Sequence, residues 1–437
     1  MPRKGLIGLM VLSWLVGAAL PVAPAPGVTD DAVTLGSTLL LSGPHAWWGQ
    51  GVRLGLRTAF EAANAAGGVH GRRLRVIFYD DQFHPPYARA NVQRLLHQDG
   101  VFALVAVGGT ATNEAIFEDV VREGVPNVGL ISHAHRFVSP PTRTHFTLQP
   151  SYFQQAMGAV DYLVQRRGLT QGIAVLYENN AFGKEVLAAV QARLAQYGLE
   201  LAAAAGFARG AFDVLAPVLA LSQAGAQAVI LATVARNLGR ILIEARALRF
   251  SPLWVGLSNL ARREVSELAD ANFDAELVVA TPFMDPAAQT PGMVEFRRLL
   301  ARFSPGHLPQ EPELHGYATG RVVVAALQRA GRALTRPGFL AALETLTDFD
   351  AGTTPPLTFS PTRHYGSTAI RFIRPYLLRW QPVSGWQEVP EEVAPLPGRV
   401  ALQRPARPQP AAVQVSLPEL LRRPPDLRPV PPPPSGD

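Results

Sequence analysis

The chain has 437 residues, of which 48% are hydrophobic and 17% are charged; this composition is typical of a globular protein with two or three domains and excludes disorder throughout. The formal net charge is +6, but Lys and Arg are scattered among Asp and Glu, so the sequence lacks the basic stripe of a nucleic-acid-binding protein. The absence of cysteine excludes disulfides, thiolate metal sites, thiol nucleophiles and the lipidated cysteine of a lipoprotein.

The N-terminal segment has the order of regions that is typical of a secretory signal. Arg3 and Lys4 precede an apolar run at 5–20, which is followed by a stretch rich in Ala and Pro. The apolar run is short for a membrane span, and no later segment reaches that length. We therefore expect a signal peptide of the Sec type at 1–27 and a periplasmic product. An uncleaved anchor is the alternative, because Pro26 follows the candidate cleavage site.

Short apolar runs alternate with amphipathic helical patterns as far as Thr281. The expected strands, in chain order, are 33–41, 74–79, 102–107, 128–131, 173–177, 202–207, 228–231, 253–255 and 277–280. The expected helices between them are 52–66, 87–98, 114–123, 152–167, 184–197, 214–224, 238–248 and 262–269. Strands that alternate with helices predict right-handed crossovers and parallel sheets.

After Thr281 the pattern changes. Helices are expected at 294–302, 314–334 and 339–346, and an extended run at 369–380. Two alternating series, each of domain size, predict an α/β protein with two doubly wound lobes, and the later elements can return to complete both. A (β/α)8 barrel is the structural alternative.

The C-terminal stretch is dominated by proline. Residues 391–437 hold 13 of the 39 prolines of the chain. Proline at this density forms neither a helix nor a central strand, so we expect a Pro-rich disordered tail at 390–437.

Four loops follow expected strands, where open α/β sheets bind their ligands. They are Ser42–Gly49, Gly108–Asn113, Ser132–His135 and Tyr177–Gly183. The second of these loops begins a helix, and its free backbone N–H groups beside a hydroxyl would suit a carboxylate. The alternative is that Thr112 or Asn113 simply caps the helix.

Enzymatic motifs are missing where they would be expected. Gly183-Lys184 lacks the remainder of a P-loop, no strand is followed by a G-x-G-x-x-G turn, and Ser258 lacks the glycines of a nucleophile elbow. His133 and His135 have no third metal ligand nearby in the sequence. Asp80-Asp81, at the end of a strand, is interpreted as a pair of solvated turn carboxylates. We therefore expect no enzyme, no catalytic residue, no metal and no cofactor.

Together these segments resemble the periplasmic leucine/isoleucine/valine-binding protein family over about 33–386. The matching motifs, in their order, are Ser42-Gly43-Pro44 with Trp48-Gly49, Asn64 to Arg72 (NAAGGVHGR), Tyr79-Asp80-Asp81, Gly109 to Asn113 (GTATN), Gly124-Val125-Pro126 and Phe182-Gly183-Lys184. The Gly67-Gly68 pair also fits a helix C-cap independently.

The resemblance implies the type I periplasmic-binding-protein fold, in which a multi-strand hinge joins two lobes. The first lobe would comprise 28–150 and 282–352, and the second 151–281 and 353–389. Several crossings between the lobes permit closure and restrain its direction.

The resemblance also implies a ligand site between the lobes. The loop of Thr110 would bind the ligand carboxylate, Trp48 would contact the ligand side chain, and Phe182 would close from the second lobe. The implied ligand-binding residues are Trp48, Thr110, Ala111, Thr112, Ser132, Ala134, His135, Phe182, Val234, Leu257 and Ser258.

We expect a monomeric, non-enzymatic receptor that binds a small carboxylate-bearing metabolite, delivers it to the membrane permease of an ABC transporter and does not bind nucleic acid. A ligand-sensing subunit of a signalling system with the same fold is the alternative, because fold alone does not separate the two.

The sequence argues against an ordinary α-amino acid as the ligand. In the amino-acid-binding members of the family, an acidic residue of the second lobe pairs with the ligand ammonium, whereas the matching stretch here, Gly256–Asn259, has no acid. His135 would repel an ammonium if it were protonated. We therefore favour a carboxylic acid or an amide-like metabolite. The alternative is that Glu178 or another acid enters from a shifted loop.

Overall fold

The computed structural model describes residues 25–43, 46–208, 211, 213–272, 276–376 and 379–391. The expected signal peptide and nearly all of the expected Pro-rich tail lie outside these residues. Within them, no helix combines the length and the apolar character that crossing a membrane requires.

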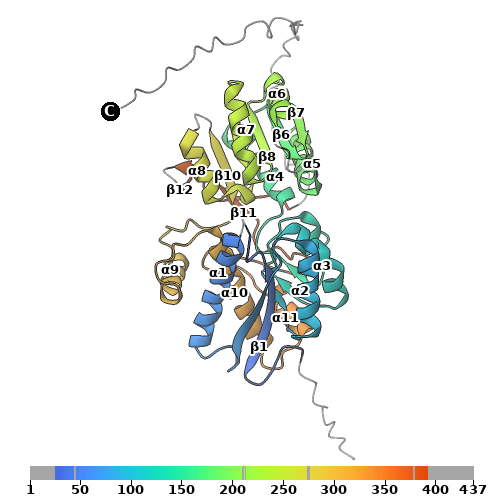
Figure 1. Cartoon of the computed structure of the whole chain (residues 1–437), viewed down its shortest axis with the longest axis vertical. Coiled ribbons are helices and arrows are strands. Elements are labelled where there is room, and N and C mark those ends of the chain that lie inside the picture. The colour runs from blue at the N-terminus through green and yellow to red at the C-terminus, as the bar shows by residue number, and fades with distance from the viewer. Residues whose placement is uncertain are drawn as a thin grey trace, which may run out of the picture. The chain divides into compact units, whose positions relative to one another are not determined.

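The first lobe is built on a five-stranded parallel sheet with the order β2-β1-β3-β4-β5. Its strands are β1 (Ala32–Leu39), β2 (Arg73–Asp80), β3 (Leu104–Val105), β4 (Asn127–Val128) and β5 (His145–Phe146). Its helices are α1 (Ala46–Ala65), α2 (Pro85–His97), α3 (Thr110–Arg122), α9 (Pro291–Phe303), α10 (Glu311–Ala330) and α11 (Arg336–Glu344). In Figure 1 the blue and teal elements from the N-terminal half share this lobe with the orange helices α10 and α11.

The second lobe has a mixed sheet with the order β12-β11-β10-β9-β8-β6-β7. The parallel strands are β6 (Ile173–Glu178), β7 (Ala203–Phe207), β8 (Ala228–Ala232), β9 (Leu253–Gly256) and β10 (Leu277–Thr281). The antiparallel strands are β11 (Ala369–Tyr376), β12 (Arg379–Pro382) and β13 (Gln387–Glu388). The helices are α4 (Tyr152–Asp161), α5 (Ala181–Gln196), α6 (Leu215–Gln223), α7 (Ala235–Ala247) and α8 (Arg263–Asn272).

Three short helical segments complete these elements. They are the 3-10 helices η1 (His135–Phe137) and η3 (Ser258–Leu260), and the π-helix η2 (Tyr162–Arg166). The segment expected as one helix at 152–167 is therefore α4 followed by a π-helical turn. The extended run expected at 369–380 is the hairpin of β11 and β12, and its turn lies outside the described residues.

Helices α1 and α10 pack closely because glycines lie at their contact. A Cβ atom on Gly55 would lie 2.1 Å from the carbonyl oxygen of Glu313, and one on Gly316 would lie 2.1 Å from that of Val52. A side chain at either position would thus force the helices apart. The spacing of this helix pair is fixed by backbone contact.

The second lobe contains a buried ion pair between α4 and α5. Arg193 contacts both oxygens of Asp161, at 2.7 Å from Nε and 3.0 Å from Nη2. The Tyr197 hydroxyl donates to the same carboxylate at 2.7 Å, and burial together with this carboxylate raises the pKa of Tyr197 to about 12. The pair satisfies polar groups that would be costly to bury alone.

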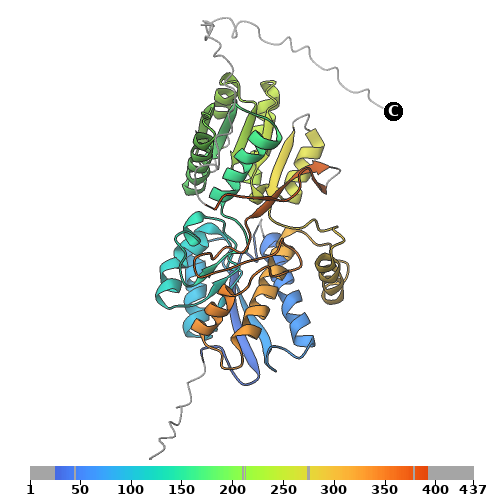
Figure 2. The same ribbon diagram turned by 180° about the vertical axis from the view of Figure 1, so that it is seen from behind.

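The chain returns to the second lobe later than the sequence suggested. Thr353 was expected to open the second-lobe segment, but Leu357 and Phe359 are fully buried in the hydrophobic core of the first lobe. Figure 2 shows the chain passing from the orange first-lobe helices into the red strand β11. We therefore place this crossing between Tyr365 and Ala369.

Two of the crossing segments pair with each other. Thr147, just after β5, donates its N–H to the carbonyl of His364 at 2.8 Å and accepts from Gly366 at 2.9 Å. This short parallel bridge joins the first and the last connection between the lobes. A hinge of paired segments favours one bending direction over free rotation.

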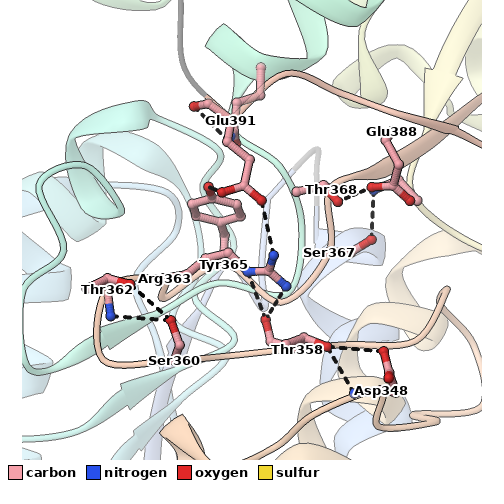
Figure 3. A network of polar contacts seen from close by, with 12 residues as sticks. Asp348, Thr358, Ser360, Thr362, Arg363, Tyr365, Ser367, Thr368, Glu388 and Glu391 are labelled. Carbon is pink, nitrogen blue, oxygen red and sulfur yellow. Dashed lines mark hydrogen bonds and ion pairs between the residues drawn. The ribbon is translucent and has the colours of Figure 1, made fainter. Parts of the chain in front are cut away.

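A polar network ties the end of the described chain to this hinge. Glu391 contacts Arg363 at 3.1 Å and accepts from the Tyr365 hydroxyl at 3.0 Å, as Figure 3 shows. On its other side Arg363 donates to the carbonyl oxygen of Thr358. Glu391 lies within the expected tail at 390–437, so the ordered contacts extend into that segment.

Candidate functional site between the lobes

The loop after β3 forms the start of α3, and no side chain caps the first-turn N–H groups of this helix. Gly109, with φ of 87°, turns the chain into the helix. Thr112 and Asn113 do not cap it, because their side chains donate to carbonyl oxygens of the preceding turn. The alternative that Thr112 or Asn113 simply caps this helix is therefore wrong. Backbone N–H groups without a cap at a helix start favour an anion.

The sequence-predicted residues of two neighbouring loops come together at this helix start. The Thr110 and Ser132 hydroxyls lie 2.9 Å apart, and the Ala134 N–H donates to Ser132 at 3.3 Å. Thr110 and Ala111 are partly exposed, whereas Thr112 is buried. Thr110, Ala111 and Ser132 therefore stay candidates for ligand contact, whereas Thr112 shapes the turn.

His135 faces the connection to the second lobe. Its ring stacks on Phe153 with centroids 5.0 Å apart, and its Nδ1 lies 3.0 Å from the Ser151 hydroxyl. Burial lowers the pKa of His135, so the ring is neutral at neutral pH. A neutral His135 would not repel an ammonium group through its charge, contrary to what we expected from the sequence.

Of the two neighbouring tryptophans, Trp47 rather than Trp48 faces the second lobe. Trp48 packs against the core of the first lobe. The guanidinium of Arg262, which follows η3 in the second lobe, lies 5.9 Å from the centroid of Trp47. Adjacent residues on a helix point about 100° apart, so the two indoles cannot share one role.

An aromatic cluster extends from this region toward α5. The Tyr152 ring contacts Phe182 at 4.6 Å and His133 at 5.0 Å, both edge to face. His133 Nδ1 lies 3.4 Å from the Ser258 hydroxyl. Burial lowers the pKa of His133 to about 3, so this ring is neutral. Phe182 thus packs against Tyr152, and its contact with a ligand stays a prediction.

The remaining second-lobe predictions have mixed outcomes. The side chain of Val234 is exposed at the start of α7, whereas that of Leu257 is fully buried in the core and cannot contact a ligand. The Ser258 N–H donates to Gln155 at 3.1 Å, and its hydroxyl faces His133. The backbone N–H and the hydroxyl of Ser258 therefore both have partners within the protein.

The acidic residues of this region differ in their availability. Glu178 accepts from Asn180 and Asn237, each at 2.9 Å, and this pairing fixes its carboxylate inside the second lobe. Glu185 accepts from two backbone amides, and burial raises its pKa to about 7. The side-chain carboxyl group of Glu311, at the start of α10, has no hydrogen bond to any residue that the structure describes. Burial raises the pKa of this group to about 8.

Two turn carboxylates shape the same edge of the first-lobe sheet. Asp80 accepts from the backbone N–H groups of Leu41, Ser42 and Gln82. Asp81 is buried, accepts from the Thr38 hydroxyl at 2.9 Å, and has a pKa raised by burial. The interpretation of both as solvated carboxylates is therefore wrong for Asp81. No group of three potential metal-ligating side chains occurs in the described parts of the chain.

Two residues near Tyr152 were not among those predicted from the sequence. Arg262 and Glu311 come from segments far apart in the chain, and each interacts electrostatically with the Tyr152 hydroxyl. Neither follows a recognisable motif. The only sequence signal was that each lies next to a helix start.

Comparison with known proteins identifies the kind of molecule that carries this site. The sequence model of the periplasmic binding protein family matches residues 32–375, which is most of the chain. The chain belongs to the periplasmic binding protein family. Members of this family are binding proteins rather than enzymes, and they work in the periplasm.

Curated relatives of this periplasmic binding protein include a Leu/Ile/Val-binding protein homologue and an amino acid binding protein. The Leu/Ile/Val-binding protein homolog 8 of Brucella abortus is 25% identical over 301 residues, which are 64% of this chain and 73% of the relative. An amino acid binding protein of Pseudomonas aeruginosa is 24% identical over 321 residues, which are 72% and 83% of the two chains.

Solved structures confirm the two-lobed type I fold predicted from the sequence. A possible leucine/isoleucine/valine-binding protein from Rhodopirellula baltica matches with a TM-score of 0.72 at 23% identity, covering 83% of this chain and 98% of its own. A fatty acid ABC transporter substrate-binding protein from Thermomonospora curvata matches with a TM-score of 0.73 at 19% identity, covering 84% and 95%. At these identities the likeness shows the fold and leaves the ligand open.

Proposed function

We propose that this protein is the solute-binding receptor of an ABC transporter and that it binds a small carboxylate-bearing metabolite that has no α-ammonium group. The observation that carries the proposal is the uncapped start of α3 beside the paired hydroxyls of Thr110 and Ser132. These donors suit a carboxylate. Relatives in ABC transport of branched-chain amino acids and of fatty acids support the receptor role.

The absence of an ammonium partner rests on the acidic residues around the site. Glu178 is held by two asparagines, and the stretch 256–259 at the end of β9 contains no acidic residue. Glu311 does lie near the site, but Arg262 interacts with it electrostatically. A ligand ammonium placed at Glu311 would therefore meet a guanidinium as well.

Calorimetric titration of the protein with leucine, isovalerate and benzoate tests this function. We expect isovalerate or benzoate to bind more tightly than leucine, and Thr110→Ala to weaken that binding at least fivefold, because a hydrogen bond to a carboxylate is lost. The exposed Thr362→Ala is the matched control. Tight binding of leucine with none of either acid would overturn the proposed ligand class.

A further inference from the structure

Arg262 of the second lobe and Glu311 of the first lobe share one aromatic neighbour, Tyr152, without forming an ion pair. Arg262 lies against Trp47, and both Arg262 and Glu311 interact electrostatically with Tyr152. The nitrogens of Arg262 are not within 4.0 Å of the Glu311 oxygens in the structure.

The polar ends of both side chains are still available for a ligand. Arg262 uses Nε to donate to the carbonyl of Asn259 at 2.8 Å, which fixes the guanidinium and leaves its two Nη groups without a hydrogen bond to a described residue. The carboxyl group of Glu311 likewise has no hydrogen bond to any residue in the described ranges. Charged side chains in such surroundings usually have partners.

Buried polar atoms without partners lie around Arg262. Trp47 Nε1, Thr233 Oγ1 and Asn259 Oδ1 are buried and have no hydrogen-bond partner. Asn259 connects these residues. Its side-chain Nδ2 donates to the backbone carbonyl of Thr233 at 2.8 Å, and its backbone carbonyl accepts from Arg262 Nε. The bond to Thr233 also fixes which amide atom of Asn259 is the oxygen.

These groups form a set of donors and acceptors with a definite complement. Trp47 Nε1 and the Arg262 Nη groups donate, whereas Asn259 Oδ1 accepts and the Glu311 carboxyl group offers an accepting oxygen in either protonation state. A terminal carboxamide, or the closely related ureido group, offers one carbonyl oxygen and N–H donors, so it can satisfy both kinds of group. A carboxylate at this end of the ligand has no N–H, so the accepting oxygens of Asn259 and Glu311 would face its lone pairs. An apolar end would leave both the donors and the acceptors of the protein unpaired.

We infer that Arg262 and Glu311 are specificity-determining residues that recognise a terminal carboxamide or ureido group at the end of the ligand opposite its carboxylate. This inference rests on the proposed function, because the carboxylate end is assigned to the start of α3. Arg262 donates to the carbonyl oxygen of the ligand, and Glu311 accepts from its N–H.

Titration with a panel of short acids tests the inference. The probes are succinamate and glutaramate, which carry a terminal amide, succinate and glutarate, which carry a second carboxylate, and isovalerate, which has an apolar end. We expect at least one amide acid to bind ten or more times as tightly as the diacid of the same length and as isovalerate.

Variants assign this preference to the two residues. Glu311→Leu, which removes the accepting oxygen, and Arg262→Gln should each reduce amide-acid affinity at least tenfold while changing isovalerate affinity less than threefold. Glu264→Leu and Arg263→Gln are matched controls on exposed positions and should change neither affinity. A fold change that is equal for amide acids and isovalerate would show that these residues only support the structure and would overturn the inference.

The outcomes separate this inference from the proposed function. If isovalerate binds and the amide acids bind no more tightly, the inference fails and the carboxylate receptor stands. If leucine binds and no acid of the panel does, the proposed ligand class fails and the inference fails with it.

Discussion

Glu185 of the second lobe accepts a hydrogen bond from the backbone N–H of His135 of the first lobe at 3.1 Å. The same oxygen accepts from the N–H of Phe153, also at 3.1 Å. One carboxylate therefore joins α5 to both sides of the connection between the lobes. Its burial makes this contact sensitive to any relative movement of the lobes.

Ligand binding should change the lobe arrangement and the environment of Trp47. We expect addition of a bound acid to alter intrinsic fluorescence and to reduce the radius of gyration in solution scattering, because the ligand adds contacts to both lobes. Trp47→Phe should abolish more of the fluorescence change than Trp48→Phe, since only Trp47 lies against Arg262. An unchanged scattering profile at saturating ligand would contradict closure.

The α1–α10 contact should tolerate no side chain at Gly55. Gly55→Ala places a methyl group 2.1 Å from the Glu313 carbonyl oxygen, so we expect a loss of about 1–3 kcal/mol in the free energy of unfolding. Urea unfolding measures it. Gly385→Ala is the control, because no atom lies within 4 Å of the added methyl group. Equal stabilities of the two variants would be inconsistent with the helix contact.

Breaking the buried ion pair of the second lobe should cost more than replacing it. Asp161→Asn leaves Arg193 buried without its charge partner, and we expect a loss of about 3 kcal/mol. The double variant Asp161→Leu with Arg193→Met should recover part of this loss. Asp31→Asn, on the surface, is the control. A double variant less stable than Asp161→Asn would contradict this account.

The end of the folded chain can be located by truncation. A chain ending at Glu391 should keep its stability and ligand affinity. One that ends at Val389 loses the contacts of Glu391 with Arg363 and Tyr365 and should be less stable by about 1 kcal/mol, since one partly exposed ion pair and one hydrogen bond disappear. Loss of cooperative melting in the longer chain would show that the remaining tail is structural.

Buried neutral histidines should make the protein sensitive to acid. Burial, then the nearby His364 and Arg136, lowers the pKa of His145 to about 3 from an unfolded value of 6.5. The unfolded state therefore binds the proton first as pH falls, and the contribution of His145 to stability is lost progressively from about pH 6.5 downward.

Unfolding free energies at pH 7.5 and pH 4.5 measure this effect. His145→Phe retains a ring beside Phe137 but cannot titrate, so we expect a smaller loss of stability on acidification than in the parent protein. The difference between the two pH values is the readout, because the substitution also removes the hydrogen bond between His145 Nδ1 and the Thr144 hydroxyl. Equal losses in both proteins would contradict the assignment.

The sequence predicted helices and strands best where the hydrophobic pattern was not interrupted by an unusual backbone conformation. The strand expected at 173–177 is observed as β6 (Ile173–Glu178). The apolar run at 102–107 also suggested a full strand, but the regular strand is only Leu104–Val105; Ala106 adopts a positive φ of 52°, and pairing resumes as a single bridge between Gly108 and Ile131. Local backbone reversals of this kind leave no mark on hydrophobic periodicity.

The candidate site was predictable only in part, for a different reason. Residues such as Thr110 and Ser132 follow strands of one sheet, and strand ends meet at one edge, so their proximity follows from the topology. Trp47, Arg262 and Glu311 meet through the placement of one lobe against the other, which depends on the hinge and on side-chain packing. That information is spread over the whole chain.

The glycine contact between α1 and α10 also determines how far apart two residues of the candidate site lie. Trp47 and Glu311 lie in the first turns of these two helices, so the backbone contact at Gly55 and Gly316 sets their separation. A side chain added at either glycine would therefore change the spacing of Trp47 and Glu311 from positions remote from both.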